Sequence, residues 1–147
     1  MARFRDTSGM QAALAQQLEP GETLRHWAFG VKQPNVALIT FLYCLAFIPG
    51  VIAVATMTKE YVVGLTDRRF IVLRFKGSQI NVLEAQSWPL GALPPVQTST
   101  GSLFTHIRID DPAKPFVAKF HRLGTPDNRP QAMAIAEGLE VGGRAIV

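Results

Sequence analysis

The chain has 147 residues, enough for one domain with an apolar core of its own. Hydrophobic residues make up 48% of it, and a formal charge of +4 with a pI near 9.6 favours acidic partners, either anionic lipid or nucleic acid. The single cysteine excludes an internal disulfide, and the N-terminus lacks the apolar core of a signal peptide. We therefore expect the bulk of the chain to remain in the cytoplasm.

A short helix and a first strand are expected before residue 30. Residues 22–29 alternate loosely in hydrophobicity, as a half-buried strand does. A Pro-Gly pair at 20–21 separates this strand from the preceding segment and is typical of a helix end. Apolar residues recur at helical spacing over about 8–18 and predict an N-terminal helix there; they are Met10, Ala13, Leu14 and Leu18.

Residues 33–58 contain no Asp, Glu, Lys, Arg or His. As one straight helix, these 26 residues would reach about 39 Å, which is enough for the ~30 Å hydrocarbon core of a bilayer. We interpret the segment as an apolar helical membrane insert. Its principal positions are Val36, Leu38, Ile39, Phe41, Leu42, Leu45, Phe47, Ile48, Pro49, Gly50, Val51, Ile52 and Val54.

The path of this insert depends on its two flanks. If the strands on either side belong to one sheet, Lys32 and Lys59 must lie near each other on one side of the membrane. Two full crossings need about 40 residues, whereas two arms of about eleven residues reach about 16 Å each. This geometry favours a re-entrant helical hairpin with its apex near Pro49 and Gly50. A single span and a helix buried in a soluble core remain open as alternatives.

Five or six antiparallel strands and a closing helix are expected after the insert. Residues 61–65 and 70–75 have the pattern of two strands joined by a tight turn, and Ile71, Leu73 and Phe75 share one face. A strand near 80–88 is expected to break at about Ala85, and the Ser/Thr-rich stretch 98–102 is interpreted as a loop.

Two further strands are expected at 103–109 and 114–120, and the second of these places Phe116, Ala118 and Phe120 on one face. The sequence DNRP at 127–130 predicts the start of a helix over about 128–140. Its apolar stripe consists of Ala132, Ile135, Ala136 and Leu139.

Two short motifs carry a resemblance to a known family: LEPGE at 18–22 and YVVGLTDRRFI at 61–71. With the order of the elements, they resemble the bacterial pleckstrin-homology-like (PH-like) domains. The resemblance implies a mainly β fold, a curved antiparallel sheet or open barrel closed by a C-terminal helix. The chain would then be a single domain over 1–147, with its membrane insert between the first two strands. The resemblance also implies a membrane setting, because several members carry membrane segments, and it assigns no activity.

Basic and aromatic residues flank the insert on both sides. Basic flanks at both ends fit a cytoplasmic location of both ends. Each cation held near an anionic surface adds ~1 kcal/mol to membrane binding. Solvated charge at strand ends explains Arg68 and Arg69 equally well. The expected headgroup or interface residues are Trp27, Lys32, Lys59, Tyr61, Arg68 and Arg69.

The sequence contains no recognisable catalytic, cofactor or metal motif. His26, His106 and His121 are far apart, and none has a second ligand at metal-binding spacing. Glycine-rich phosphate loops are missing, and the basic and aromatic alternation at 116–122 is what a half-buried strand requires. We therefore expect no catalytic residue, no cofactor, no metal and no nucleic-acid partner, and a chain that is not an enzyme.

Two functions fit these expectations. The first is a membrane-anchored accessory subunit that helps to assemble or stabilise a larger membrane protein complex, with lipid and an integral membrane protein as partners. It is motivated by the shallow insert, because unpaired backbone groups at membrane depth cost several kcal/mol unless another protein covers them. The alternative is a peripheral sensor of anionic lipid surfaces, which the basic flanks would serve.

Overall fold

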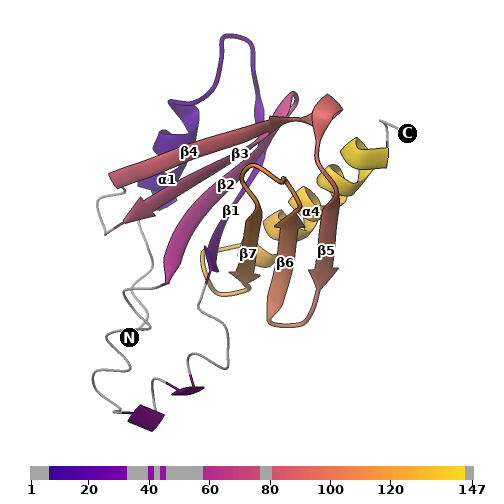
Figure 1. The fold of residues 1–147 in the computed structure, drawn as a ribbon. Coiled ribbons are helices and arrows are strands. Elements are labelled where there is room, and N and C mark those ends of the chain that lie inside the picture. Colours follow the sequence, from indigo (N-terminus) through magenta and orange to yellow (C-terminus); the bar gives the residue numbers. More distant parts are fainter. Residues whose placement is uncertain (1–6, 33–39, 42–43, 46–57, 77–80, 145–147) are drawn as a thin grey trace.

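The computed structural model describes residues 7–32, 40–41, 44–45, 58–76 and 81–144. Within these residues the chain forms a mainly β domain with a helix near each end (Figure 1). The elements are α1 (Thr7–Ala15), β1 (Leu24–Lys32), β2 (Lys59–Thr66), β3 (Arg69–Lys76), β4 (Asn81–Pro89), the 3-10 turn η1 (Leu90–Ala92), β5 (Val96–Thr100), β6 (Phe104–Ile109), β7 (Phe116–His121) and α4 (Asn128–Arg144).

All seven strands belong to one antiparallel sheet in the order β4-β3-β2-β1-β7-β6-β5, and the sheet does not close into a barrel. The sheet has two parts, β4 to β1 and β7 to β5. They join between β1 and β7, where Val31 pairs with Lys119. We call this junction the seam. The expected mainly β fold, with an antiparallel sheet and a C-terminal helix, is confirmed.

One helix covers each face of the sheet. Neighbouring residues of one strand point to opposite faces, so Ala28 enters the core under α4 and Phe29 enters the core under α1. Both helices bury apolar residues that their spacing predicts, but α1 ends at Ala15, so the expected helical position of Leu18 is wrong. The buried members are Met10, Ala13 and Leu14 in α1, and Ala132, Ile135, Ala136 and Leu139 in α4.

The strand faces predicted in β3 and β7 are confirmed, since each set of apolar residues is buried together. Two predictions are wrong. The stretch interpreted as a loop contains β5, an edge strand whose mostly exposed Ser and Thr residues give no apolar alternation. Strand β4 also continues through Ala85, which pairs with Leu73, and its irregularity falls opposite Arg74 and Phe75.

Most of the expected membrane insert lies outside the described residues. Of its principal positions the structure describes Phe41 and Leu45, which are helical and 57% and 67% exposed. In the part of the chain that is described, no helix combines the length and the hydropathy needed to cross a membrane. The expected proximity of the two flanks is confirmed, because Lys32 and Lys59 are register partners in the β1–β2 pair.

The side chain of Asn128 connects both sides of the seam. It is fully buried at the first residue of α4. Its Oδ1 accepts hydrogen bonds from the Phe29 N–H (2.8 Å) and the Thr125 hydroxyl (3.1 Å), and its Nδ2 donates to the carbonyls of Phe29 (3.0 Å) and His121 (2.7 Å). These four bonds match the two lone pairs and two hydrogens of an amide. The amide therefore fastens α4 to both β1 and β7.

Replacing Asn128 with Asp tests this role. A carboxylate has no hydrogen to donate, so the Phe29 and His121 carbonyls would lose their partner and face a buried negative charge. We expect Asn128→Asp to lower the free energy of unfolding by about 3 kcal/mol or more. Urea denaturation measures this, with Asn81→Asp on exposed β4 as the control. Equal stability of the two variants would contradict the assignment.

Candidate anion-binding site at the base of the 33–58 connection

The pairing of β1 with β2 brings two lysines together where residues 33–58 leave and rejoin the sheet. Lys32 ends β1, Lys59 begins β2, and both side chains are exposed. In the described residues neither ammonium has a carboxylate within ion-pair distance. Two like charges held side by side favour an anion near them.

A pocket of about 190 Å³ opens beside these lysines on the α4 side of the sheet. We call it the cationic pocket. Its charged residues are Lys32, Lys59, Arg74, Lys114 and a single acid, Glu84. Strand alternation explains why four of these side chains meet. Each of β1, β2, β3 and β4 turns one of them to the same face of the sheet. Lys114 comes from the loop between β6 and β7.

Glu84 is the counter-ion of the cationic pocket. Its Oε1 lies 2.8 Å from Lys114 Nζ and its Oε2 lies 3.4 Å from Arg74 Nε. The hydrogen bond from Lys114 is the main cause that lowers the pKa of Glu84, so this carboxylate is ionised at neutral pH. Arg74 Nε is buried and has no hydrogen-bond partner, which leaves one donor in the pocket unsatisfied.

Tyr61 forms the apolar wall of the cationic pocket. Its ring packs edge-on against Phe116, with centroids 5.2 Å apart, and burial raises the pKa of its hydroxyl. The pocket therefore combines four cations, one carboxylate and an aromatic wall. Such a site can bind a phosphate or carboxylate group, because charge-assisted hydrogen bonds to anions are about twice as strong as neutral ones.

The structure brings only part of the expected interface set together. Lys32, Lys59 and Tyr61 line the cationic pocket. Arg68 and Arg69 lie at the β2–β3 turn, the opposite end of β2, about 25 Å away by strand length. Trp27 packs against the core under α1, so it lies on the other face of the sheet.

Three charged residues of the cationic pocket, Arg74, Glu84 and Lys114, were not predicted from the sequence. Arg74 lies within the strand expected at 70–75 and Lys114 begins the strand expected at 114–120, and neither was expected to belong to a site. No local pattern signals these roles, because the pocket arises from the register of β3 with β4 and from the position of the β6–β7 loop. Strand alternation gives the face of Arg74 but not its neighbours.

Arg69 belongs to an internal ion pair instead. Its guanidinium lies 3.0 Å from the carboxylate of Glu22, whose side chain is 1% exposed, and it also donates to the Gln17 carbonyl. The Thr66 hydroxyl donates to Glu22 Oε2 at 2.7 Å, and the Glu19 N–H donates to Oε1 at 3.0 Å. The two sequence motifs, LEPGE and YVVGLTDRRFI, are thus joined through one buried carboxylate.

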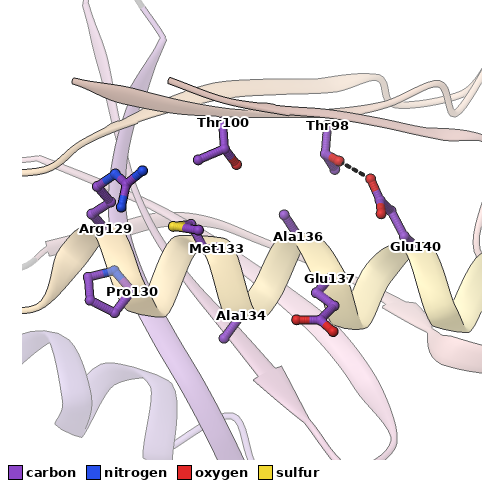
Figure 2. A pocket seen from close by; sticks show the side chains of 9 residues that line it. All are labelled: Thr98, Thr100, Arg129, Pro130, Met133, Ala134, Ala136, Glu137 and Glu140. Carbon is purple, nitrogen blue, oxygen red and sulfur yellow. Dashed lines mark hydrogen bonds between the residues drawn. The ribbon is translucent and has the colours of Figure 1, made fainter. Parts of the chain in front are cut away.

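A second hollow of about 510 Å³ lies between β5 and α4. We call it the β5–α4 groove. Figure 2 shows Thr98 and Thr100 of β5 facing α4, with Met133 and Ala136 at its centre. Arg129 lies toward one end of this view, and Glu140 lies at the other, where it accepts a hydrogen bond from Thr98 (Figure 2).

The described residues contain a few smaller groups of polar side chains. Among the described residues, no group of three or more His, Cys, Asp or Glu side chains is placed to hold a metal ion. Ser99 and His106 face each other across exposed strands at 3.5 Å. Asp111 accepts a hydrogen bond from Trp88 Nε1 at 2.9 Å, so one of the paired acids at 110–111 serves the fold.

Comparison with known proteins finds a similar fold but does not show a family. No protein-family model matches the sequence, and no curated protein matches it either. Among solved structures, the chain is similar to the hSac2 domain from human phosphoinositide phosphatase Sac2, with a TM-score of 0.51 and 12% sequence identity. That alignment covers 97% of this chain and 86% of the other. At this identity the likeness shows the fold alone: an antiparallel sheet with a C-terminal helix, as in PH-like folds.

The same comparison corrects the expectation that the chain is not an enzyme. The solved domain of similar fold comes from a phosphatase, so the fold does not separate this chain from enzymes. Absence of a familiar motif was too weak a basis for that conclusion. The likeness does not make this chain an enzyme, because activity depends on the residues of a site rather than on the fold that carries it.

The Glu22 ion pair predicts a specific response to acid. The hydrogen bond from Arg69 is the main cause that lowers the pKa of Glu22 from 4.5 to about 2. A lowered pKa stabilises the fold above the unfolded value, and this contribution is lost as pH falls from about 5 to about 2. We expect Glu22→Gln to cost roughly 3 kcal/mol at neutral pH and little near pH 2, because the wild-type carboxylate is protonated there.

Urea denaturation across this pH range measures the difference. The control is Glu137→Gln, which removes an exposed carboxylate of α4 and should leave the acid dependence of the wild type in place. Parallel stability curves for wild type and Glu22→Gln would show that the ion pair does not contribute as described.

Proposed function

We propose that the chain is a PH-like domain that docks on an anionic membrane surface, with residues 33–58 entering the bilayer. The observation that carries this proposal is the position of the cationic pocket at the base of the uncharged 33–58 connection. An apolar segment and a cluster of cations act together on such a surface, because the first partitions into hydrocarbon and the second attracts the headgroups.

The β1–β2 pairing supports a one-sided arrangement. The two strands are paired from Leu24 with Thr66 to Lys32 with Lys59, so the ends of the connection cannot lie on opposite sides of a bilayer while the sheet is intact. In this proposal the connection enters and leaves through one surface as a re-entrant hairpin. The cytoplasmic surface fits best, because anionic lipids are concentrated there.

Removing the two lysines tests the docking role. We predict that the double variant Lys32→Ala, Lys59→Ala binds vesicles with anionic lipid about 10- to 30-fold more weakly than wild type, at ~1 kcal/mol for each cation near the surface. Binding to neutral vesicles should not change, because the connection is intact. Flotation of the full chain with vesicles of both kinds, at low and high salt, measures the two affinities.

The matched control is the double variant Arg25→Ala, Arg122→Ala. It makes the same change in net charge at exposed positions: Arg25 lies near the start of β1, and Arg122 follows the last residue of β7. We expect this control to bind nearly as wild type does. If both double variants lose the same affinity, the effect is one of net charge and the cationic pocket is not the docking site.

A second candidate function is that of an accessory subunit in a membrane complex, and the β5–α4 groove favours it. β5 is an edge strand. Gly101 N–H donates to Phe104 O and Asp110 N–H donates to Pro95 O, so the odd-numbered residues of β5 face β6. The backbone groups of Thr98 and Thr100 therefore point outward. An extended segment of a partner could pair with them and place side chains in the groove.

Proline at position 98 tests this second function. Thr98→Pro removes an outward N–H without breaking the β5–β6 ladder, and Thr98→Val keeps that N–H while removing the hydroxyl. We predict that the tagged chain migrates as part of a larger complex in mild detergent, that Thr98→Val retains this complex, and that Thr98→Pro migrates alone. A wild-type chain that migrates alone would exclude the accessory role.

A further inference from the structure

Glu84 gives the cationic pocket a property that a plain cluster of lysines lacks. Its carboxylate already occupies the pocket and is held by Lys114 and Arg74. It lies on the edge strand β4 and its side chain is 44% exposed, so an incoming anion meets this charge directly. Any ligand must therefore attract the surrounding cations strongly enough to outweigh repulsion by the resident carboxylate.

The loop that carries Lys114 is held in place before a ligand arrives. The Lys114 carbonyl accepts a hydrogen bond from Gln86 Nε2 at 3.0 Å, which fastens the β6–β7 loop to β4. Asp111 fixes the same loop, since its carboxylate accepts bonds from Trp88 Nε1 and from the Ala113 N–H, both at 2.9 Å. Binding therefore costs little ordering of the loop that carries Lys114.

Arg74 supplies a donor that forms an ion pair but no hydrogen bond within the fold. Its Nε is buried and lies 3.4 Å from Glu84 Oε2, without the geometry of a hydrogen bond. A tetrahedral group with several terminal oxygens can accept from this donor and from the lysines at the same time. A phosphomonoester has three such oxygens and carries close to two charges at neutral pH, whereas a phosphodiester has two and carries one.

We infer that the cationic pocket selects a phosphomonoester over a phosphodiester because its net charge is positive, and that Glu84 limits this selectivity. The inference rests on the proposed anion-binding role of this site and names its ligand class. Attraction to the four cations and repulsion from Glu84 both scale with ligand charge. With the net charge of the pocket positive, a dianion gains about twice the attraction of a monoanion. A monoanion offers the cations no more charge than Glu84 already does.

The first experiment uses soluble probes. Thermal denaturation of the full chain in mild detergent is followed with glycerol 3-phosphate, a phosphomonoester, and with dimethyl phosphate, a phosphodiester. We expect stabilisation of wild type by the first and little by the second. The variant Glu84→Gln should bind dimethyl phosphate about fivefold more tightly than wild type, because one negative charge has left the pocket. Glycerol 3-phosphate should gain by a larger factor, because the dianion is repelled more strongly by Glu84, so the preference between the probes should increase. Equal binding of both probes by wild type would overturn the inference.

The control is Glu140→Gln, which makes the same change of charge in the β5–α4 groove, outside the cationic pocket. It should leave the preference between the probes unchanged. If it changes the preference as much as Glu84→Gln does, net charge rather than the pocket decides, and the inference fails. Glu84 lies on an exposed edge strand, so its replacement is not expected to unfold the domain.

The second experiment separates a lipid from a soluble phosphate. Vesicles of phosphatidic acid are compared with vesicles of phosphatidylglycerol matched in surface charge. Tighter binding to phosphatidic acid, increased further by Glu84→Gln and reduced by free glycerol 3-phosphate, supports both the ligand class and membrane docking. Equal binding to the two vesicles retains docking and overturns the selectivity. Stabilisation by glycerol 3-phosphate without vesicle binding supports the phosphomonoester site and overturns docking.

Discussion

The integrity of the sheet depends on the seam between β1 and β7, and one amide side chain supports that seam. The strands on either side of it form regular ladders, whereas the seam itself has a single register pair. Asn128 supplies hydrogen bonds to both strands from the start of α4. The ring of Phe120 lies over Gly30 beside it, so close that a β-carbon at Gly30 would come within 2.6 Å of the ring. The β1 end that carries Lys32, and hence the cationic pocket, is positioned by this arrangement.

The motifs that suggested the family have a structural explanation. Glu22, Thr66 and Arg69 form one buried network, and Asp67 accepts a further bond from the Thr23 N–H at 3.0 Å. These residues fix the entry to β1 against the β2–β3 turn. Their role is to hold two segments of the chain together, at the end of the sheet away from the cationic pocket. The residues of the two motifs and the residues of the candidate anion-binding site thus lie at opposite ends of the sheet.

Much of the fold could be predicted because burial imposes a period on the sequence. The stripes of both helices and the faces of β3 and β7 follow from apolar spacing alone. β5 could not be found in this way, since an exposed edge strand has no apolar face to reveal it. The lysine pair followed from one assumption, that β1 and β2 are neighbours. Arg74, Lys114 and Glu84 could not be grouped, because their proximity depends on strand register and on a loop path that no local pattern encodes.

Because Lys32 pairs with Lys59, the stability of the sheet also depends little on the length of the segment that connects them. The cost of closing a flexible loop grows only with the logarithm of its length, by about 0.6 kcal/mol for each doubling. The connection of 26 residues therefore places little demand on the fold beyond bringing its two ends together. A segment of different length or composition could therefore connect the same two strand ends without changing the sheet. In the proposed function, membrane affinity and ligand selectivity could then change independently, the first through the connection and the second through the pocket at its base.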